Sequence, residues 1–124
     1  MKIYFAHSKT IDYQNLIYTP IKSDQISKTH EFILPHDEKP GESHKNNTRD
    51  FYKSLDLMLA EVSDPATGLG IELGWAFDDG TEIFAFYQAG TKPSGSIFAV
   101  TKNLIEYTDS ADLLEKVREI ISNR

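Results

Sequence analysis

Short apolar runs alternate along the chain with longer segments whose apolar residues recur at helical spacing. The run over residues 57–62 is almost entirely apolar, as in a parallel strand that is covered on both faces. Pro20 divides the first helical segment, because proline fits the first turn of a helix but not its interior. The pattern predicts strands over residues 3–6, 31–34, 57–62, 83–87 and 103–107, and helices over about 11–28, 48–55, 68–79 and from 110 onwards.

The ends of three predicted helices carry recognisable signals. Thr48 and Asp109 stand where an N-cap is expected, and Asp79-Gly80 stands where a helix should stop. The helix before Gly80 has its apolar residues on one stripe, which should face the core: Leu69, Leu73, Ala76 and Phe77.

Strands that alternate with helices are typical of a doubly wound parallel sheet. We therefore expect an α/β fold with a small sheet of about five parallel strands and helices on both faces. A chain of 124 residues is enough for one domain with its own core, so we expect a single domain over residues 1–124.

Composition narrows the choice of partners. Cysteine is absent and no apolar run approaches 18 residues, which predicts a cytoplasmic protein that is not in a membrane. The formal charge of −6 argues against binding to a nucleic acid polymer, which needs a basic face. No pair of histidines has metal-ligand spacing, so we expect neither a metal ion nor another cofactor.

The loops that follow the strands should meet at one edge of the sheet, where open α/β sheets bind ligands. They cover residues 7–10, 36–41, 63–70 and 88–96. In the third loop, Gly68 and Gly70 would let a sugar or a phosphate approach the backbone closely. Glu72 follows in the first turns of the next helix, where the helix dipole would favour its charged form. A carboxylate held there suits nucleophilic attack on a sugar, although it could equally serve only to stabilise its own helix.

Three segments in this order resemble the nucleoside 2-deoxyribosyltransferase family: Tyr4-Phe5-Ala6, Leu34-Pro35-His36, and the motif A-E-V-S-x-P-x-x-G-x-G-x-E-L-G-x-A at residues 60–76. Within the family, the chain is most similar to the 2′-deoxynucleoside 5′-phosphate N-hydrolase branch. The resemblance implies a flavodoxin-like fold, a homodimer or higher homo-oligomer, and cleavage of the N-glycosidic bond of a nucleoside or nucleotide.

The resemblance also implies roles for individual residues. Glu72 corresponds to the nucleophile that forms a covalent glycosyl–enzyme intermediate, and Tyr4 to an aromatic residue close to it. Ser8 matches a serine that contacts the phosphate, and His36 a position against the bound nucleotide. Ser94 resembles a serine that reaches the phosphate across a dimer interface. From sequence position alone, His36 could instead be a loop histidine in solvent.

The family's assisting acid lies in the helix before the central strand, and here its position is displaced. Counting back from Asp56 leads to Thr48, which cannot perform acid–base chemistry. A helix shorter by two residues would bring Asp50 to that position, and we expect Asp50 to assist catalysis.

Two binding positions also depart from the family. Ala66 stands where a serine or aspartate contacts the ribose or phosphate, and we expect Asp64 or Thr67 to take over this contact. Thr10 stands at the place of a phosphate-binding arginine, and Lys9 beside it offers a point charge rather than a fork. These departures make cleavage of an N-glycosidic bond a firmer expectation than a requirement for the 5′-phosphate.

Two further residues have structural interpretations. We expect the Glu61 carboxylate to pair with the backbone or with a lysine, and Trp75 to pack on the helix surface or at a dimer contact. For the whole chain, we expect an N-glycosidase that works by hydrolysis. The alternatives are a deoxyribosyltransferase, which passes the sugar to a second base, and a nucleotide-sensing module without activity.

Overall fold

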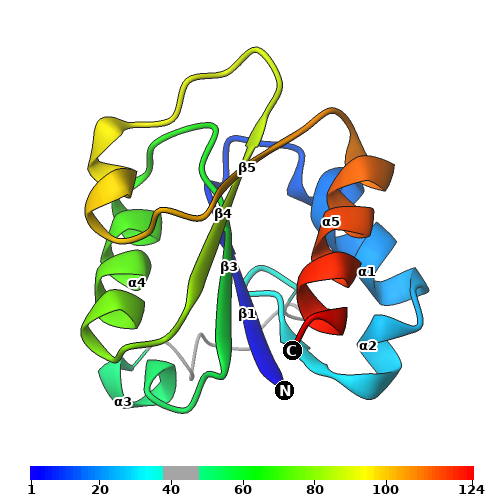
Figure 1. Cartoon of the computed structure of the whole chain (residues 1–124), viewed down its shortest axis with the longest axis horizontal. Coiled ribbons are helices and arrows are strands. Elements are labelled where there is room, and N and C mark those ends of the chain that lie inside the picture. Colours follow the sequence, from blue (N-terminus) through cyan, green and yellow to red (C-terminus); the bar gives the residue numbers. More distant parts are fainter. Residues whose placement is uncertain (38–47) are drawn as a thin grey trace.

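The computed structural model describes residues 1–37 and 48–124. Within this part of the chain, five strands form one parallel sheet in the order β2-β1-β3-β4-β5 (Figure 1). The strands are β1 (Lys2–His7), β2 (Glu31–Ile33), β3 (Leu57–Glu61), β4 (Ile83–Gln88) and β5 (Leu104–Tyr107). This strand order is that of flavodoxin-like doubly wound folds, so the predicted fold class is confirmed.

The central strand β3 pairs with β1 on one side and β4 on the other. Every residue of β3 is buried, as its continuous apolar run predicted. Figure 1 shows the sheet edge-on, with α3 (Arg49–Tyr52) and α4 (Thr67–Asp78) on one face and α1 (Thr19–Ser23), α2 (Ile26–Thr29) and α5 (Ser110–Ser122) on the other. Two irregular helices complete the layers, the π-helix η1 (Gln14–Tyr18) and the 3-10 helix η2 (Gly95–Ala99).

Each face of the sheet has its own hydrophobic core. On the α4 side, Met58 and Ala60 pack with Leu69 and Leu73, and on the α5 side Leu57 and Leu59 pack with residues that include Val117.

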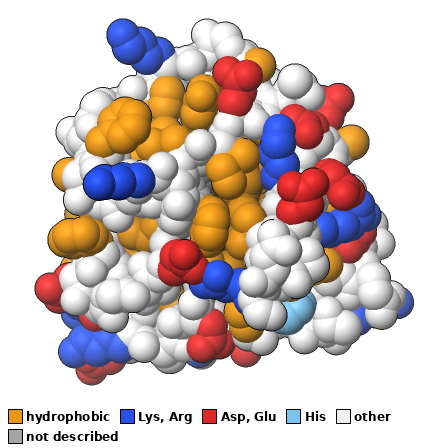
Figure 2. All heavy atoms as spheres, viewed as in Figure 1, with side chains coloured by type: hydrophobic (Ala, Val, Ile, Leu, Met, Phe, Trp, Pro, Cys, Tyr) orange, Lys and Arg blue, Asp and Glu red, His pale blue; other side chains and the backbone are white. Residues whose placement is uncertain are grey.

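Figure 2 shows one face of the molecule, on which a strip of hydrophobic side chains runs between charged ones. Of the described helices, none has the length and apolar character needed to cross a membrane.

The predicted helix signals are confirmed. The Thr48 side chain accepts a hydrogen bond from the Phe51 N–H, and the Asp109 carboxylate accepts one from the Asp112 N–H. Gly80 follows the end of α4 with φ 73°, a left-handed conformation that favours glycine. The Gly80 and Thr81 N–H groups donate to the Phe77 and Ala76 carbonyls, which makes this end a Schellman motif.

Some predicted elements were wrong in detail. The segment 11–28 is divided twice, at Pro20 as expected and again at Asp24, whose extended backbone separates α1 from α2. Helix α3 ends at Tyr52 rather than Leu55. Phe77 was expected in the core but is 58% exposed, because the packed stripe of α4 is narrower than its apolar pattern. Of the loop expected over residues 36–41, residues 38–41 lie outside the described part of the chain.

Candidate active site

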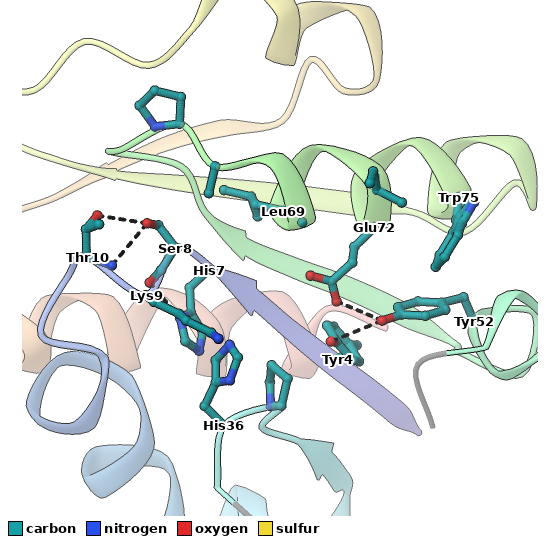
Figure 3. Close-up of a pocket in the computed structure, with 15 residues that line it drawn as sticks. Tyr4, His7, Ser8, Lys9, Thr10, His36, Tyr52, Leu69, Glu72 and Trp75 are labelled. Carbon is teal, nitrogen blue, oxygen red and sulfur yellow. Dashed lines mark hydrogen bonds between the residues drawn. The ribbon is translucent and has the colours of Figure 1, made fainter. Parts of the chain in front are cut away.

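A pocket of about 600 Å³ opens at the carboxyl ends of β1 and β3 (Figure 3). The chain continues from β1 to one edge of the sheet and from β3 to the other, so the pocket lies at the topological switch point. Among the sequence-predicted site residues, six line this single pocket: Tyr4, Ser8, Lys9, His36, Gly68 and Glu72. Five others are not among its lining residues: Asp50, Asp64, Thr67, Gly70 and Ser94.

Glu72 projects from α4 into the pocket. The sequence predicted that the helix dipole favours the charged form of Glu72, but the structure shows a hydrogen bond in this role. Helix α4 begins at Thr67 after the N-cap Ala66, and no acidic residue lies in its first turn. Because the effect of the helix dipole falls off within the first turn, it contributes little at Glu72. Instead, the Tyr52 hydroxyl donates a hydrogen bond of 2.9 Å to Glu72 Oε2. A hydrogen bond to a carboxylate favours its charged form.

A second phenol lies against this pair. The Tyr4 and Tyr52 hydroxyl oxygens are 3.2 Å apart, and the two ring centroids are 5.2 Å apart. Burial raises the pKa of Tyr4, and the nearby charge of Glu72 raises it further. Burial also raises the pKa of Tyr52. Both phenols therefore stay protonated at neutral pH and can act as donors.

The structure places Asp50 away from the pocket, contrary to the prediction. Its side chain is 92% exposed, and Asp50 Oδ1 lies 3.7 Å from the Lys53 ammonium. Two residues correspond to more than half a helical turn, so Asp50 and Tyr52 point in different directions from α3. The residue of α3 that reaches the pocket is Tyr52.

The wall of the pocket opposite α4 is a cluster of aromatic rings. The rings of His7 and His36 have centroids 5.2 Å apart, and both contact Tyr13. The backbone N–H of His36 donates a hydrogen bond of 2.9 Å to the Tyr18 hydroxyl. The same hydroxyl lies 2.6 Å from His7 Nε2. His36 is therefore half-buried against the pocket, and its contact with a bound nucleotide stays a prediction.

His7 is held as a neutral imidazole. Its Nδ1 lies 2.9 Å from the Ser8 carbonyl, which can only accept, so Nδ1 carries the hydrogen and Nε2 accepts from Tyr18. Burial lowers the pKa of His7 to about 4, with a smaller contribution from His36. No described cluster of three or more His, Cys, Asp or Glu residues could hold a metal ion.

Hydrogen bonds join Ser8, Thr10 and Asp64 into one bridge at the mouth of the pocket. Thr10 donates from its N–H to Ser8 Oγ at 3.1 Å and from its hydroxyl to Asp64 Oδ2 at 2.8 Å. Ser8 Oγ and Thr10 Oγ1 are 2.8 Å apart (Figure 3). The bridge links the loop after β1 to the loop after β3. Asp64 therefore contacts Thr10 rather than lining the pocket.

Two aromatic residues, Tyr52 and Trp75, line the pocket although sequence reasoning did not place them there. The Tyr52 ring lies 5.0 Å from the Trp75 ring, and together they cover the side of the pocket next to Glu72. Trp75 was expected at the surface of α4. The aromatic pair Phe51-Tyr52 just before β3 was the available signal, but the sequence does not show which of its rings turns inward.

Glu61 has the structural role that was predicted. Its carboxylate is 1% exposed and accepts hydrogen bonds from the Ser63 N–H at 2.6 Å and the Ser63 hydroxyl at 2.9 Å. The Tyr107 hydroxyl also donates to it. Ser94 is the N-cap of η2 and accepts from the Ser96 N–H, so its role at a dimer interface stays a prediction.

Comparison with known proteins identifies the fold. No protein-family model and no curated protein matches the sequence. Among solved structures, the chain is similar to the CMP N-glycosidase BcmB of Clostridium botulinum, with 22% identity, a TM-score of 0.70, and coverage of 97% of this chain and 99% of that one. It is also similar to the 2-deoxyribosyltransferase of Bacillus psychrosaccharolyticus, with 21% identity, a TM-score of 0.59, and coverage of 92% and 90%.

A third similar structure is a conserved protein of Enterococcus faecalis V583, with 17% identity, a TM-score of 0.61, and coverage of 97% of this chain and 98% of that one. These similarities define the class of fold. The chain has the nucleoside 2-deoxyribosyltransferase-like fold, as the sequence resemblance predicted.

Proposed function

We propose that this protein is an N-glycosidase that hydrolyses the bond between base and sugar in a nucleoside or nucleoside 5′-monophosphate. The observation that carries the proposal is the position of Glu72. Its carboxylate reaches into a pocket of about 600 Å³ at the switch point of the sheet and accepts a hydrogen bond from Tyr52. A pocket of this size accommodates a small organic ligand such as a nucleotide.

In the proposed reaction, a carboxylate oxygen of Glu72 attacks C1′ of the sugar. The bond between C1′ and the base nitrogen breaks, its electron pair leaves with the base, and the base takes up a proton from solvent. Water then attacks C1′, which releases the Glu72 carboxylate and a proton and leaves the hydroxyl on the sugar. These two displacements follow the logic of retaining glycosidases.

Two features support a 5′-phosphate on the substrate. Lys9 lines the pocket and supplies a positive charge, and the described residues provide no side-chain cap for the nearby N-terminus of α4. Exposed N–H groups at a helix start favour anions. The fold is shared with a CMP N-glycosidase, which makes CMP the first nucleotide to test.

The test measures release of free base by chromatography after incubation with nucleosides and nucleoside monophosphates. Glu72→Gln is expected to lower kcat/KM by at least about a thousandfold, as for loss of a nucleophile. Glu115→Gln, on the exposed surface of α5, is the matched control and should retain full activity. Full turnover by Glu72→Gln would exclude the mechanism.

Two outcomes separate the alternatives. If base is exchanged only when a second free base is added, the protein is a transferase. If CMP or another nucleotide binds tightly and no base is released, the protein is a sensing module rather than an enzyme.

A further inference from the structure

The short helix α3 is attached to α4 at both of its ends. At its start, the Arg49 guanidinium forms a forked contact with Asp79, at 2.8 Å to Oδ2 and 2.6 Å to Oδ1, and a third bond of 2.8 Å to Asp78. Bidentate pairs of this kind fix orientation as well as distance. At its end, Tyr52 donates to Glu72.

Glu72, Trp75 and the C-cap Asp79 lie on one face of α4. Glu72 and Asp79 are seven residues apart, which is about two helical turns, and Trp75 lies between them. The Arg49 guanidinium lies 5.9 Å from the Trp75 ring centroid, and the Tyr52 ring centroid lies 5.0 Å from it. Helix α3 therefore lies along this face of α4, with the ion pair at one end and the phenol at the other.

This attachment determines where the Tyr52 hydroxyl can be. Tyr52 is 1% exposed, and its ring is held between Tyr4 and Trp75. Figure 3 shows its hydroxyl pointing along the pocket wall to the Glu72 carboxylate. A glutamate side chain has three rotatable torsions, and a hydrogen bond from a fixed donor restricts the last of them.

We infer that Tyr52 is a positioning residue that aims the Glu72 carboxylate, and that the Arg49–Asp79 ion pair acts on catalysis only through the placement of Tyr52. This inference rests on the proposed function, since it assigns Glu72 the role of nucleophile. Tyr52 belongs to the short helix in which the resemblance placed an assisting acid.

The first experiment is Tyr52→Phe, which removes one oxygen and keeps the ring packed. For the base-releasing reaction, kcat should fall about 10- to 100-fold, as for a lost hydrogen bond to a charged group, while KM changes less than about twofold. The matched control is Tyr107→Phe, which also removes a buried phenol that donates to a carboxylate, Glu61, but outside the pocket. The control should lose thermal stability without losing kcat.

The second experiment tests the ion pair through a double-mutant cycle. Arg49→Ala alone should lower kcat by about the same factor as Tyr52→Phe, and in the Tyr52→Phe background it should lower kcat less than about twofold further. Arg118→Ala is the control, because two nitrogens of the Arg118 guanidinium donate to Asp24 Oδ1 on the other side of the sheet. It should leave kcat unchanged in both backgrounds.

The outcomes separate this inference from the proposed function. If Tyr52→Phe keeps the wild-type kcat, or if Arg49→Ala lowers kcat equally in both backgrounds, the inference is wrong while hydrolysis by Glu72 stands. If the wild-type protein releases no base from any nucleoside or nucleotide, the proposed function fails and the inference fails with it.

Discussion

At the scale of single residues, the pocket combines a wall of aromatic rings with the Glu72 carboxylate. His7 and Tyr18 are buried in the aromatic wall, and each has its hydrogen-bonding capacity satisfied within it. A buried polar network of this kind is stabilising only while its protonation state is kept. Of these two residues, His7 is the one that takes up a proton in acid, because its pKa is lowered to about 4 while burial raises the pKa of Tyr18.

The first prediction concerns the stability of the folded chain against pH. The pKa of His7 is lowered to about 4, below its ordinary value of 6.5, so the unfolded chain takes up the proton more readily than the folded one. The contribution of His7 to the free energy of unfolding is therefore fully present above pH 6.5 and is lost as pH falls towards 4. Between pH 7 and 4.5 this loss should amount to about 2–3 kcal/mol.

His7→Asn removes this titration while keeping an amide donor for the Ser8 carbonyl. Urea unfolding at both pH values should show a smaller decrease in stability for the variant than for the wild type. All other titrating groups are common to the two proteins and cancel in the comparison. An equal decrease in both would contradict the neutral, buried state of His7.

At the scale of secondary-structure elements, the ends of helices are set by local sequence, and the direction of their side chains is set by packing. Thr48, Asp109 and Gly80 act where their types predicted, because caps satisfy backbone groups within a few residues. The rotation of α3 was not predictable in this way. It depends on contacts of Arg49 and Tyr52 with residues of α4 that are 20 to 30 positions away.

Two glycines of the α4 region give a paired prediction of opposite sign. Gly80 has φ 73°, so Gly80→Ala should lower the free energy of unfolding by about 1 kcal/mol. Gly74 lies inside the helix, and a Cβ there would meet no heavy atom within 4 Å apart from its chain neighbours and the helix's own backbone. Gly74→Ala should therefore raise stability by about 0.5–1 kcal/mol, because alanine favours the helix over glycine. Denaturant melts of both variants check the signs, and a stabilised Gly80→Ala would refute the left-handed end of α4.

At the scale of the whole molecule, the exposed apolar residues are concentrated in the layer that also carries the pocket. Ile71 and Phe77 of α4 are 48% and 58% exposed, and Phe98 of η2 is 64% exposed. Large exposed apolar side chains of this kind commonly mark contacts between proteins. They are consistent with the homo-oligomer that the family resemblance implies.

The prediction at this scale is a mass in solution of twice the chain, measured by light scattering. Phe98→Asp should shift the protein towards monomer by placing a charge in the contact. Lys28→Asp, on the exposed surface of α2 across the sheet, is the control and should leave the mass unchanged. A wild-type protein that is monomeric at all concentrations would remove the expected role of Ser94 across an interface.

The sequence by itself determined the order of strands and helices, the helix ends and the edge of the sheet that carries the pocket. These follow from local periodicity, from turn residues and from the rule that parallel strands bring their following loops to one edge. Tertiary structure decided which side chains meet there. It turned Tyr52 rather than Asp50 towards Glu72, and it joined Asp64 to Thr10, because these directions depend on packing between segments far apart in the chain.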